Sequence, residues 1–420
     1  MRNPLARRAV LLTTIAAVLL EMPRGAFGGD APPLLLPERL HVEVTGGPAP
    51  VETLRLAILT TLRTQVPILR DARVDVERTN PPLEPLPPSS EITVLATLAA
   101  AVPGGGPFSR AVPVVLTNTI LPWSDAEVLL VSNSPERLPF GKVLYLGSLT
   151  TPHTVRLLYH HQNGSRSRRM ALTVSLSNPA AEPVRVWASG GSGGPGPDES
   201  IAGHEAARRF LDQYWSHAGF LVRIPANSTV PLFVHDLAPQ AAVSGLAQIG
   251  LVEGQRLNLQ VTARLEGEMD PPTASYEPDF DRNHQRGAFA HPQIARFLAY
   301  TVGGPPLVMT LGAQADLLRE GDSRLPLGGN YGVVYMFEVQ AVNPTAAPAS
   351  IALVMHADGG EARGIFLVDR TIVTSPVVRP ASPRALITIR LDPAARRILR
   401  IATMPESASS YPVHLTLEPP

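Results

Sequence analysis

Proline is the residue that most restricts the fold of this chain. The 420 residues include 44 prolines, which is roughly twice the average usage. Each proline fixes φ and removes a backbone N–H donor, so long helices are excluded wherever prolines are dense. Short strands joined by stiff turns remain. The sequence therefore predicts a mainly β protein.

Charge and cysteine content exclude several classes of function. The 36 basic and 36 acidic residues cancel, and neither sign forms a long run. Nucleic acid is therefore not predicted as a partner, and nothing points to an anionic membrane surface. The chain contains no cysteine. Disulfides, thiolate zinc sites, cysteine nucleophiles and an acylated lipoprotein cysteine are all excluded.

The first 28 residues have the pattern of a signal peptide. Met1–Arg8 carries three arginines, Ala9–Leu20 is an apolar or hydroxylic run of twelve residues, and Ala26-Phe27-Gly28 is the expected cleavage site. A membrane anchor is the alternative, but crossing a bilayer takes about 20 apolar residues. We therefore expect a secreted, periplasmic or cell-surface protein that is not an integral membrane protein after signal removal.

Short runs rich in Val, Leu and Thr, broken by turn residues, follow along much of the chain. Their spacing favours β-sandwiches or barrels. The runs that predict strands are Leu40–Val44, Glu127–Ser132, Val143–Leu149, Thr154–His160 and Met170–Leu176. Val51–Leu62 is ambiguous between a helix and a strand.

Two distant segments of the sequence are alike. Met170–Pro183 reads MALTVSLSNPAAEP and Tyr335–Pro348 reads YMFEVQAVNPTAAP, with five coincident residues that include an Asn-Pro pair in each copy. An Asn-Pro turn ends a strand, because proline cannot continue the hydrogen-bond ladder. The likeness predicts two related antiparallel β-sandwich domains.

These patterns divide the chain into five expected parts. They are a signal peptide (1–28), a Pro-rich N-terminal region of uncertain fold (29–122), a first β-sandwich (123–265) with an inserted helix (200–217), a connecting region (266–325) and a second β-sandwich (326–420).

The inserted helix is the exception to the β pattern. Gly190–Pro197 is expected to be a flexible tract before it, and Asp198 or Ser200 is a candidate N-cap. Beyond the cap, apolar residues recur at helical spacing and share one face.

Three aromatic residues are candidate ligand-binding side chains. Trp187, Tyr214 and Trp215 would bind a carbohydrate if they lined a groove. The alternative is that these rings seal the edge of the sandwich. Aromatic stripes usually belong to a core, so the packing interpretation is favoured.

Glu277, Asp279 and Asp281 are candidate calcium ligands. Asp279 and Asp281 match the start of an EF-hand loop, but His284 and Ala290 stand where that loop requires Gly and Glu. A looser Ca²⁺ site on the three carboxylates is one interpretation, and a solvated acidic loop is the favoured one.

His284 and His291, seven residues apart near these carboxylates, are candidate zinc or general-acid residues. His160 and His161 are adjacent in a predicted strand. Adjacent strand side chains point to opposite faces, so this pair is not expected to share one ion.

Known catalytic motifs are missing from the sequence. It has no Walker A loop and no His-Glu-x-x-His pattern. We therefore predict no catalytic residue and no cofactor beyond the Ca²⁺ alternative.

Three short motifs carry a resemblance. They are Val131–Glu136 (VSNSPE), the Asn-Pro strand pair with its inserted Gly/Pro–helix segment, and Gly329–Val333 (GNYGV). Over roughly residues 125–350 the chain resembles a family of secreted, largely cyanobacterial proteins of unknown function. The resemblance implies an exported β-rich protein and implies no activity.

The favoured hypothesis is an exported, non-enzymatic β-sandwich protein that acts as a scaffold or interaction module. Its expected partner is a cell-wall glycan or another envelope protein. The first alternative is a carbohydrate-binding or carbohydrate-cleaving protein that uses the three aromatics. The second is a metal-dependent hydrolase centred on His284 and His291.

Overall fold

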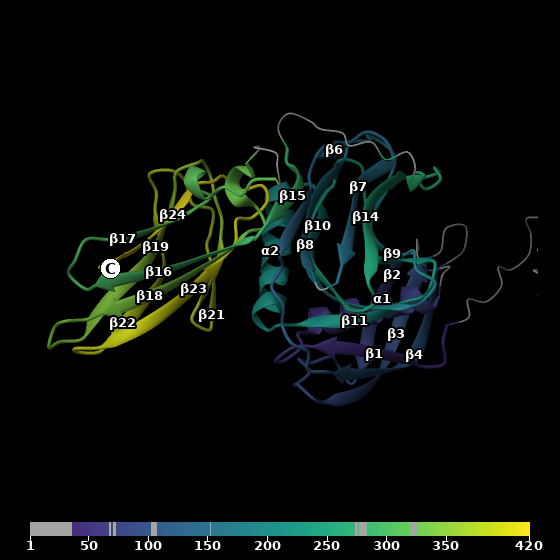
Figure 1. The fold of residues 1–420 in the computed structure, drawn as a ribbon, viewed down its shortest axis with the longest axis horizontal. Helices are drawn as coiled ribbons and strands as arrows, with labels where there is room; N and C mark the ends of the chain where they lie inside the picture. Colours follow the sequence, from purple (N-terminus) through teal and green to yellow (C-terminus); the bar gives the residue numbers. More distant parts are fainter. Residues whose placement is uncertain are drawn as a thin grey trace, which may run out of the picture. The chain divides into compact units, whose positions relative to one another are not determined.

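The computed structural model describes residues 36–66, 69, 73–101, 107–151, 153–273, 276, 284–320 and 326–420. The predicted signal peptide lies outside the described residues, as do Glu277, Asp279 and Asp281. The described residues form four β-sheets and two α-helices, which confirms the prediction of a mainly β protein (Figure 1). Within this part of the chain, neither helix has the length and apolar character needed to cross a bilayer.

The largest sheet has eleven strands. Their order is β15-β5-β8-β13-β10-β11-β1-β4-β3-β2, with β6 beside β8. The strands are β1 (Leu40–Thr45), β2 (Arg73–Asn80), β3 (Glu91–Ala101), β4 (Pro107–Asn118), β5 (Val128–Ser132), β6 (Arg137–Leu138), β8 (Thr154–Asn163), β10 (Val184–Gly196), β11 (Gly219–Ile224), β13 (Ala242–Glu253) and β15 (Arg286–Ala290).

A four-stranded sheet in the order β12-β9-β14-β7 packs against this large sheet. Its strands are β7 (Lys142–Thr150), β9 (Met170–Asn178), β12 (Ser228–Leu237) and β14 (Arg256–Leu265). Helix α1 (Val51–Gln65) contacts β1, β11 and β12, so the ambiguous apolar run at Val51–Leu62 is helical. We call residues 36–290 the first half.

The remaining two sheets form the second half, residues 293–420. Their orders are β16-β18-β23-β20-β21 and β17-β24-β19-β22. The strands are β16 (Gln293–Thr301), β17 (Leu307–Leu311), β18 (Val334–Val342), β19 (Ala349–Ala357), β20 (Ile365–Val368), β21 (Thr371–Thr374), β22 (Arg384–Leu391), β23 (Arg396–Thr403) and β24 (Val413–Glu418). Val339, Leu353 and Leu415 from both sheets are buried in one cluster, which is consistent with a β-sandwich.

Some strand directions differ from the antiparallel expectation. Most neighbours are antiparallel, but β1–β4, β5–β8, β6–β8 and β16–β18 are parallel. Parallel neighbours need a crossover connection, and α1 with the β2–β3 hairpin provides one between β1 and β4. The alternation of side chains along a strand carries no information about the direction of its partner.

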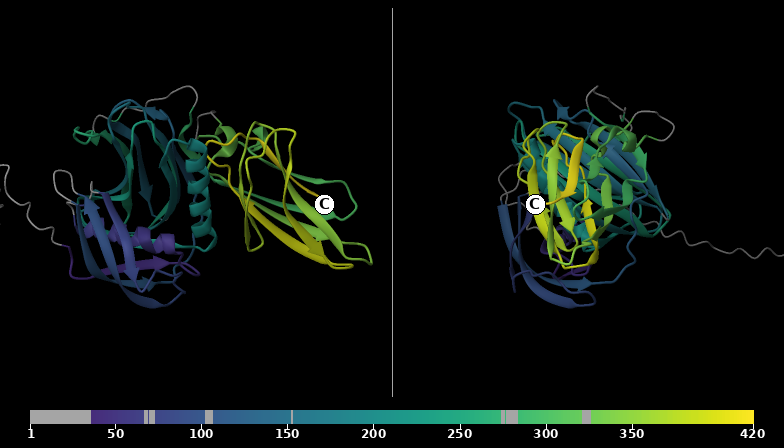
Figure 2. Two further views of the ribbon diagram at one scale, coloured as in Figure 1. Left: turned by 180° about the vertical axis from the view of Figure 1, so that it is seen from behind. Right: turned by 90° about the vertical axis from the view of Figure 1, so that its left-hand side faces the viewer.

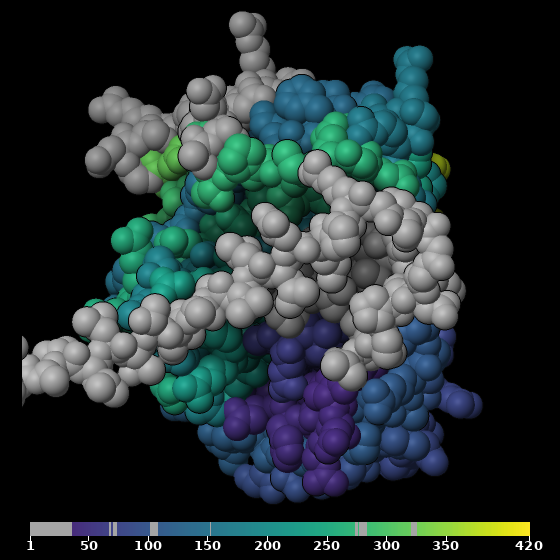
Figure 3. All heavy atoms as spheres, turned by 90° about the vertical axis from the view of Figure 1, so that its right-hand side faces the viewer, coloured from purple at the N-terminus to yellow at the C-terminus, as the bar shows by residue number. Residues whose placement is uncertain are grey.

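The N-terminal region, whose fold the sequence left uncertain, and the expected connecting region both supply strands to the sheets. The Pro-rich N-terminal region provides β1 to β4 of the large sheet, and its purple and dark-blue residues lie together at the lower end of the view in Figure 3. From residues 266–325, β15 pairs with β5 in the first half, whereas β16 and β17 pair with β18 and β24 in the second.

The expectation of a flexible tract at Gly190–Pro197 is wrong, because most of this segment belongs to β10. A Cβ atom on Gly191 would lie 2.5 Å from the Cβ of Arg209, and one on Gly193 would lie 2.1 Å from the carbonyl oxygen of Ala202. Both neighbours belong to helix α2 (Glu199–Trp215). The glycines therefore let the helix pack directly on the strand backbone (Figure 2).

The two halves share a strand order. In the first half, β8-β13-β10-β11 run side by side while β12 pairs with β9. In the second half, β17-β24-β19-β22 run side by side while β23 pairs with β18. Taken in chain order, the strands β8, β9, β10, β11, β12 and β13 therefore correspond to β17, β18, β19, β22, β23 and β24. The element between the third and fourth strand differs between the two sets. This correspondence supports the predicted likeness of the two sandwiches.

Buried asparagines occupy similar corners in both halves. Four of them are at most 1% exposed, and each side-chain Nδ2 donates to at least two main-chain carbonyl oxygens at 2.7–3.3 Å. For each asparagine, the residue two positions after one of the accepting carbonyls has a positive φ. The pairs are Asn118 with Ser89, Asn163 with Gln240, Asn178 with Asn227 and Asn343 with Ala394. The two Asn-Pro turns are thus held by the same kind of contact.

Helix α2 connects the halves. It contacts β10 and β13 on one side and β20 on the other. Phe210 and Leu211 of α2 belong to the same buried cluster as Phe366 of β20. The fully buried Arg156 of β8 donates to the carbonyl oxygens of Pro292 at 3.1 Å and Gly332 at 3.0 Å.

Candidate functional site

A cavity of about 300 Å³ is lined by residues of both halves. The first half contributes Glu136, His160 and Glu199, and the second half contributes Tyr331 and Ser407. These residues come from a loop, a strand, a helix start and two turns that are far apart in the sequence.

Three potential metal ligands meet at this cavity. One ligand atom each of Glu136, His160 and Glu199 lies within 4.8 Å of the others. Next to them, Nε2 of His284 lies 3.0 Å from Oε2 of Glu136. The side chain of Glu136 is 19% exposed and that of His284 is 33% exposed, so water reaches the group only in part.

The local structure explains how each side chain arrives there. His160 lies four residues after Arg156 on the same face of β8, the face that α2 covers through Phe210. Glu199 is the first residue of α2, directly after Asp198, whose carboxylate accepts hydrogen bonds from the main-chain nitrogens of Ser200 and Ile201. The predicted N-cap at Asp198 is therefore confirmed.

His160 is the most buried member of the group. It is 3% exposed, and its Nδ1 has no hydrogen-bond partner. Burial, and secondarily the nearby His284, lowers the pKa of His160 to about 4. The imidazole is therefore neutral near pH 7 and keeps a lone pair available to a cation.

The neighbouring His161 points to the opposite side and is fully occupied, as the alternation along β8 predicts. Its Nδ1 lies 3.0 Å from the carbonyl oxygen of Pro135, and its Nε2 lies 3.0 Å from Oγ of Ser132. A carbonyl only accepts, so Nδ1 carries the hydrogen and Nε2 accepts from the Ser132 hydroxyl. Both side chains have 0% exposure, so no substrate reaches this serine–histidine pair. The pair instead fixes the segment that leads to Glu136.

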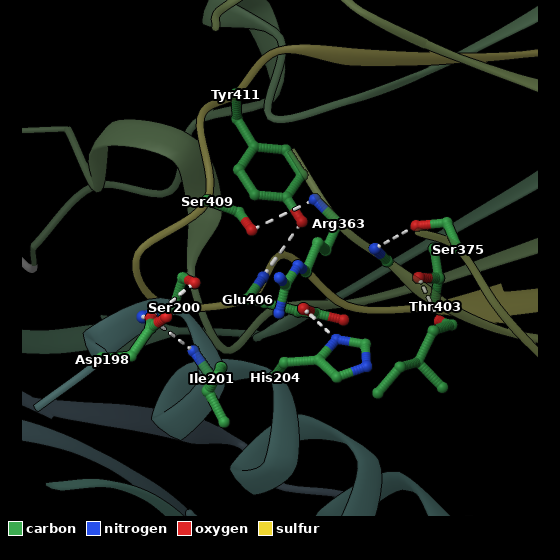
Figure 4. A network of polar contacts seen from close by, with 12 residues as sticks. Asp198, Ser200, Ile201, His204, Arg363, Ser375, Thr403, Glu406, Ser409 and Tyr411 are labelled. Atoms are coloured by element: carbon green, nitrogen blue, oxygen red, sulfur yellow. Dashed lines mark hydrogen bonds and ion pairs between the residues drawn. The ribbon is translucent and has the colours of Figure 1, made fainter. Parts of the chain in front are cut away.

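A hydrogen bond between a histidine and a buried carboxyl holds the loop that borders the cavity (Figure 4). Nδ1 of His204 in α2 lies 2.8 Å from Oε2 of Glu406, which is 1% exposed. The main-chain nitrogen of Glu406 donates to the hydroxyl of Tyr411 at 3.0 Å. A Cβ atom on Gly203 would lie 2.1 Å from the carbonyl oxygen of Ser407, so the loop rests on the helix backbone. These contacts place Ser407 at the cavity wall.

The candidate carbohydrate-binding aromatics pack against other rings. Trp123 meets Trp187 and Tyr214 edge to face, each at 5.2 Å between centroids, and stacks on His217 at 4.7 Å. Trp187 donates to Oγ1 of Thr45 at 2.9 Å. Trp215 is half-buried against the shared core cluster. This arrangement favours the packing interpretation of these side chains.

The histidines predicted for a metal or acid role separate in the structure. His284 lines the cavity beside Glu136, whereas His291 is exposed and outside the cavity lining, with its main-chain nitrogen bonded to Glu127. Glu136, His160 and Glu199 were not predicted as a group. Glu136 lies within the VSNSPE motif and Glu199 beside the N-cap, but no sequence spacing connects them.

Comparisons with known proteins show only distant likeness. No family model and no curated protein matches the chain. Among solved structures, it is similar to tripeptidyl peptidase 2 (11% identity, TM-score 0.19, 79% of this chain and 26% of that one). It is also similar to the M60 catalytic domain with CBM51 domains from Clostridium perfringens ZmpB (7% identity, TM-score 0.15, 83% of this chain and 43% of that one). The PBSX exported protein XepA matches at 11% identity and TM-score 0.15, over 66% of this chain and 85% of that one. The chain thus spans about a quarter of tripeptidyl peptidase 2 and less than half of the ZmpB fragment.

Proposed function

We propose that the chain is exported and acts as a non-enzymatic interaction module of the cell envelope, with two related β-sandwiches that bound a polar binding cavity. The observation that carries the proposal is the cavity, because both halves supply polar groups to its wall. A partner bound there would contact Glu199 of the first half and Ser407 of the second. The buried contacts of α2 keep these two walls in a fixed arrangement.

The other candidate groups are either sealed from solvent or packed against one another, which supports the proposal. The serine–histidine pair at Ser132 and His161 is sealed from solvent, and the aromatic side chains around Trp123 are occupied with one another. The predicted signal peptide and the balanced charge fit a partner in the envelope, such as a glycan or another envelope protein.

Co-sedimentation of the purified mature chain with washed cell envelopes tests this proposal. We expect saturable binding that falls at least about tenfold when Ala408→Trp fills the cavity mouth. The matched control is Ala381→Trp, because both alanines are exposed and have positive φ, and Ala381 lies outside the cavity lining. Absence of binding, or equal loss in both variants, contradicts the proposal. A secreted chain whose N-terminus is Met1 contradicts the predicted removal of residues 1–28.

A metal-dependent hydrolase is the second candidate function. The observation in its favour is the carboxylate–histidine group of Glu136, His160 and Glu199 beside a cavity. Turnover of nitrophenyl esters, phosphates or glycosides that is lost in Glu199→Gln would support this candidate and overturn the non-enzymatic proposal.

A further inference from the structure

We infer that Glu136, His160 and Glu199 form a binding site for a divalent transition-metal ion, with Zn²⁺ as the best-matched species. The site lies entirely within the first half and depends on neither export nor an envelope partner. It also differs from the calcium site that the sequence suggested at Glu277, Asp279 and Asp281.

The position of the three ligand groups supports the inference. Their ligand atoms lie within 4.8 Å of one another, on three separate elements. Zinc bonds to nitrogen and carboxylate oxygen are about 2.0–2.2 Å long, so the ligands of one ion are roughly 3–4 Å apart. Side-chain rotations of the two glutamates on ion binding would close this difference.

The state of His160 is a second, independent observation. A buried polar atom without a partner is unfavourable, and Nδ1 of His160 is such an atom in a residue that lines the cavity and is 3% exposed. An ion held between this ring and the two carboxylates would engage an imidazole whose Nδ1 has no hydrogen-bond partner.

The ligand chemistry selects the class of ion. An imidazole together with carboxylates suits borderline ions such as Zn²⁺, whereas Ca²⁺ and Mg²⁺ prefer oxygen ligands alone. His284 contacts Glu136 at 3.0 Å and would act as an outer partner that orients this carboxylate. Three protein ligands leave a further position that faces the 300 Å³ cavity, where water or a small anionic group would bind.

Isothermal titration of the chelator-treated mature chain with ZnCl₂ tests the site. We expect one ion per chain. Glu199→Gln, which conserves shape on a half-exposed helix start, should weaken Zn²⁺ at least about 100-fold, and His284→Ala should weaken it about 10- to 100-fold as an outer partner. The matched control is His41→Ala, an exposed histidine of β1 outside the cavity, which should leave the affinity unchanged.

A second readout guards against misfolding of the variants. Zn²⁺ should raise the melting temperature of the native chain and of His41→Ala, and should not raise that of Glu199→Gln or His160→Ala. Co²⁺ in place of Zn²⁺ should give a visible absorption band that requires His160. No heat and no thermal shift with Zn²⁺ would overturn the inference, and so would equal Zn²⁺ affinity in the native chain and in Glu199→Gln. Envelope binding that persists without metal leaves the proposed function intact, so the two failures are distinguishable.

Discussion

The two halves differ most at the connection between the third and fourth strands of their shared order. In the first half, α2 lies between β10 and β11, whereas in the second half the β20–β21 hairpin lies between β19 and β22. These two unlike insertions contact each other, because α2 packs against β20. Part of the interface between the halves is therefore built from elements that they do not share.

The strand before each insertion accounts for the difference. The glycines of β10 leave a bare backbone on which a helix lies flat, and the inserted residues cover the large sheet. Strand β19 is Ala349–Ala357 and carries Leu353 and Met355 instead of glycines. There the insertion forms a hairpin that extends the neighbouring sheet beside β23.

Lowering the pH should destabilise the first half more than the second, and this difference should be larger than the effect of any single substitution. Burial lowers the pKa of His160 to about 4, of His161 to about 3 and of His235 to about 4, and all three are in the first half. A lowered folded-state pKa means that the unfolded chain binds more protons below pH 6.5. The stabilisation is therefore complete above pH 6.5 and is lost as pH falls through 4. The expected loss is several kcal/mol at roughly 1.4 kcal/mol per pKa unit.

Hydrogen exchange at pH 7 and pH 4.5 measures this difference. Protection should fall first in β8 and β12, while strands of the second half, where His356 and His414 keep access to solvent, should hold longer. The exposed His153 provides the control substitution, His153→Gln. Equal loss of protection in both halves at pH 4.5 would contradict the assignment.

Truncation of Phe210 should break the contact between the insertions. The side chain is fully buried in the shared cluster, so Phe210→Ala should lower the free energy of unfolding by about 3–5 kcal/mol. Ile201 is on the same helix and 45% exposed, and Ile201→Ala should cost less than about 0.5 kcal/mol. Urea denaturation of both variants provides the comparison. An unchanged midpoint for Phe210→Ala would mean that α2 is not part of the core and would favour the groove interpretation.

A glycine-to-alanine substitution in β10 should test whether α2 requires a strand without side chains beneath it. Gly191→Ala would place Cβ 2.6 Å from the main-chain nitrogen of Phe210, and overpacking of this kind costs about 1–3 kcal/mol. Gly196 is in the same strand and has no atom within 4 Å of its added Cβ, so Gly196→Ala is the matched control. Thermal melts that shift equally for both variants would show that strand propensity, and not helix packing, explains these glycines.

The smallest expected effect concerns Glu406 at the interface. Burial raises the pKa of this carboxyl, although the contact with His204 opposes the shift. A raised folded-state pKa means that the stabilising contribution is present at low pH and is lost as pH rises above about 4.5 through the folded value. Glu406→Gln should remove this loss, so the stability of the variant should fall less than that of the native chain as pH rises from 4 to 8.

Chemical denaturation across this range measures the change in slope. Glu361→Gln is the control, because Glu361 pairs with Arg379 at the surface and is 60% exposed. An identical pH slope in the native chain and in Glu406→Gln would show that the carboxyl is solvated in solution.

Local features of the fold were predictable because neighbouring residues determine them. The strand at Leu40–Val44 and the alternating strand at Met170–Leu176 are confirmed, and the helix expected over 200–217 spans Glu199–Trp215. The Gly-rich tract was misread because glycine destabilises an isolated strand. In this fold the helix on β10 compensates for that cost, and only the tertiary structure supplies the helix.

The candidate site could not be predicted from neighbouring residues in the sequence, for a related reason. Sequence alternation excludes His160 and His161 as ligands of one ion because they point to opposite faces, and the structure has this alternation. Its actual neighbours, Glu136 and Glu199, come from other elements, and their proximity depends on α2 lying across the sheet. Of the predicted polar residues, only His284 reaches this cavity within the described part of the chain.

The buried asparagines have a consequence for how such a protein can change over time. Each corner depends on one carboxamide that donates to main-chain carbonyls, at least one of them in a turn distant in the sequence. The strands between corners need only alternate apolar and polar residues, which many sequences satisfy. Wide drift in the strands is therefore compatible with an unchanged framework, whereas Asn→Asp at a single corner would replace a donor with a second acceptor facing the same carbonyls. The framework of this protein therefore depends on four buried amides more than on the particular side chains of its strands.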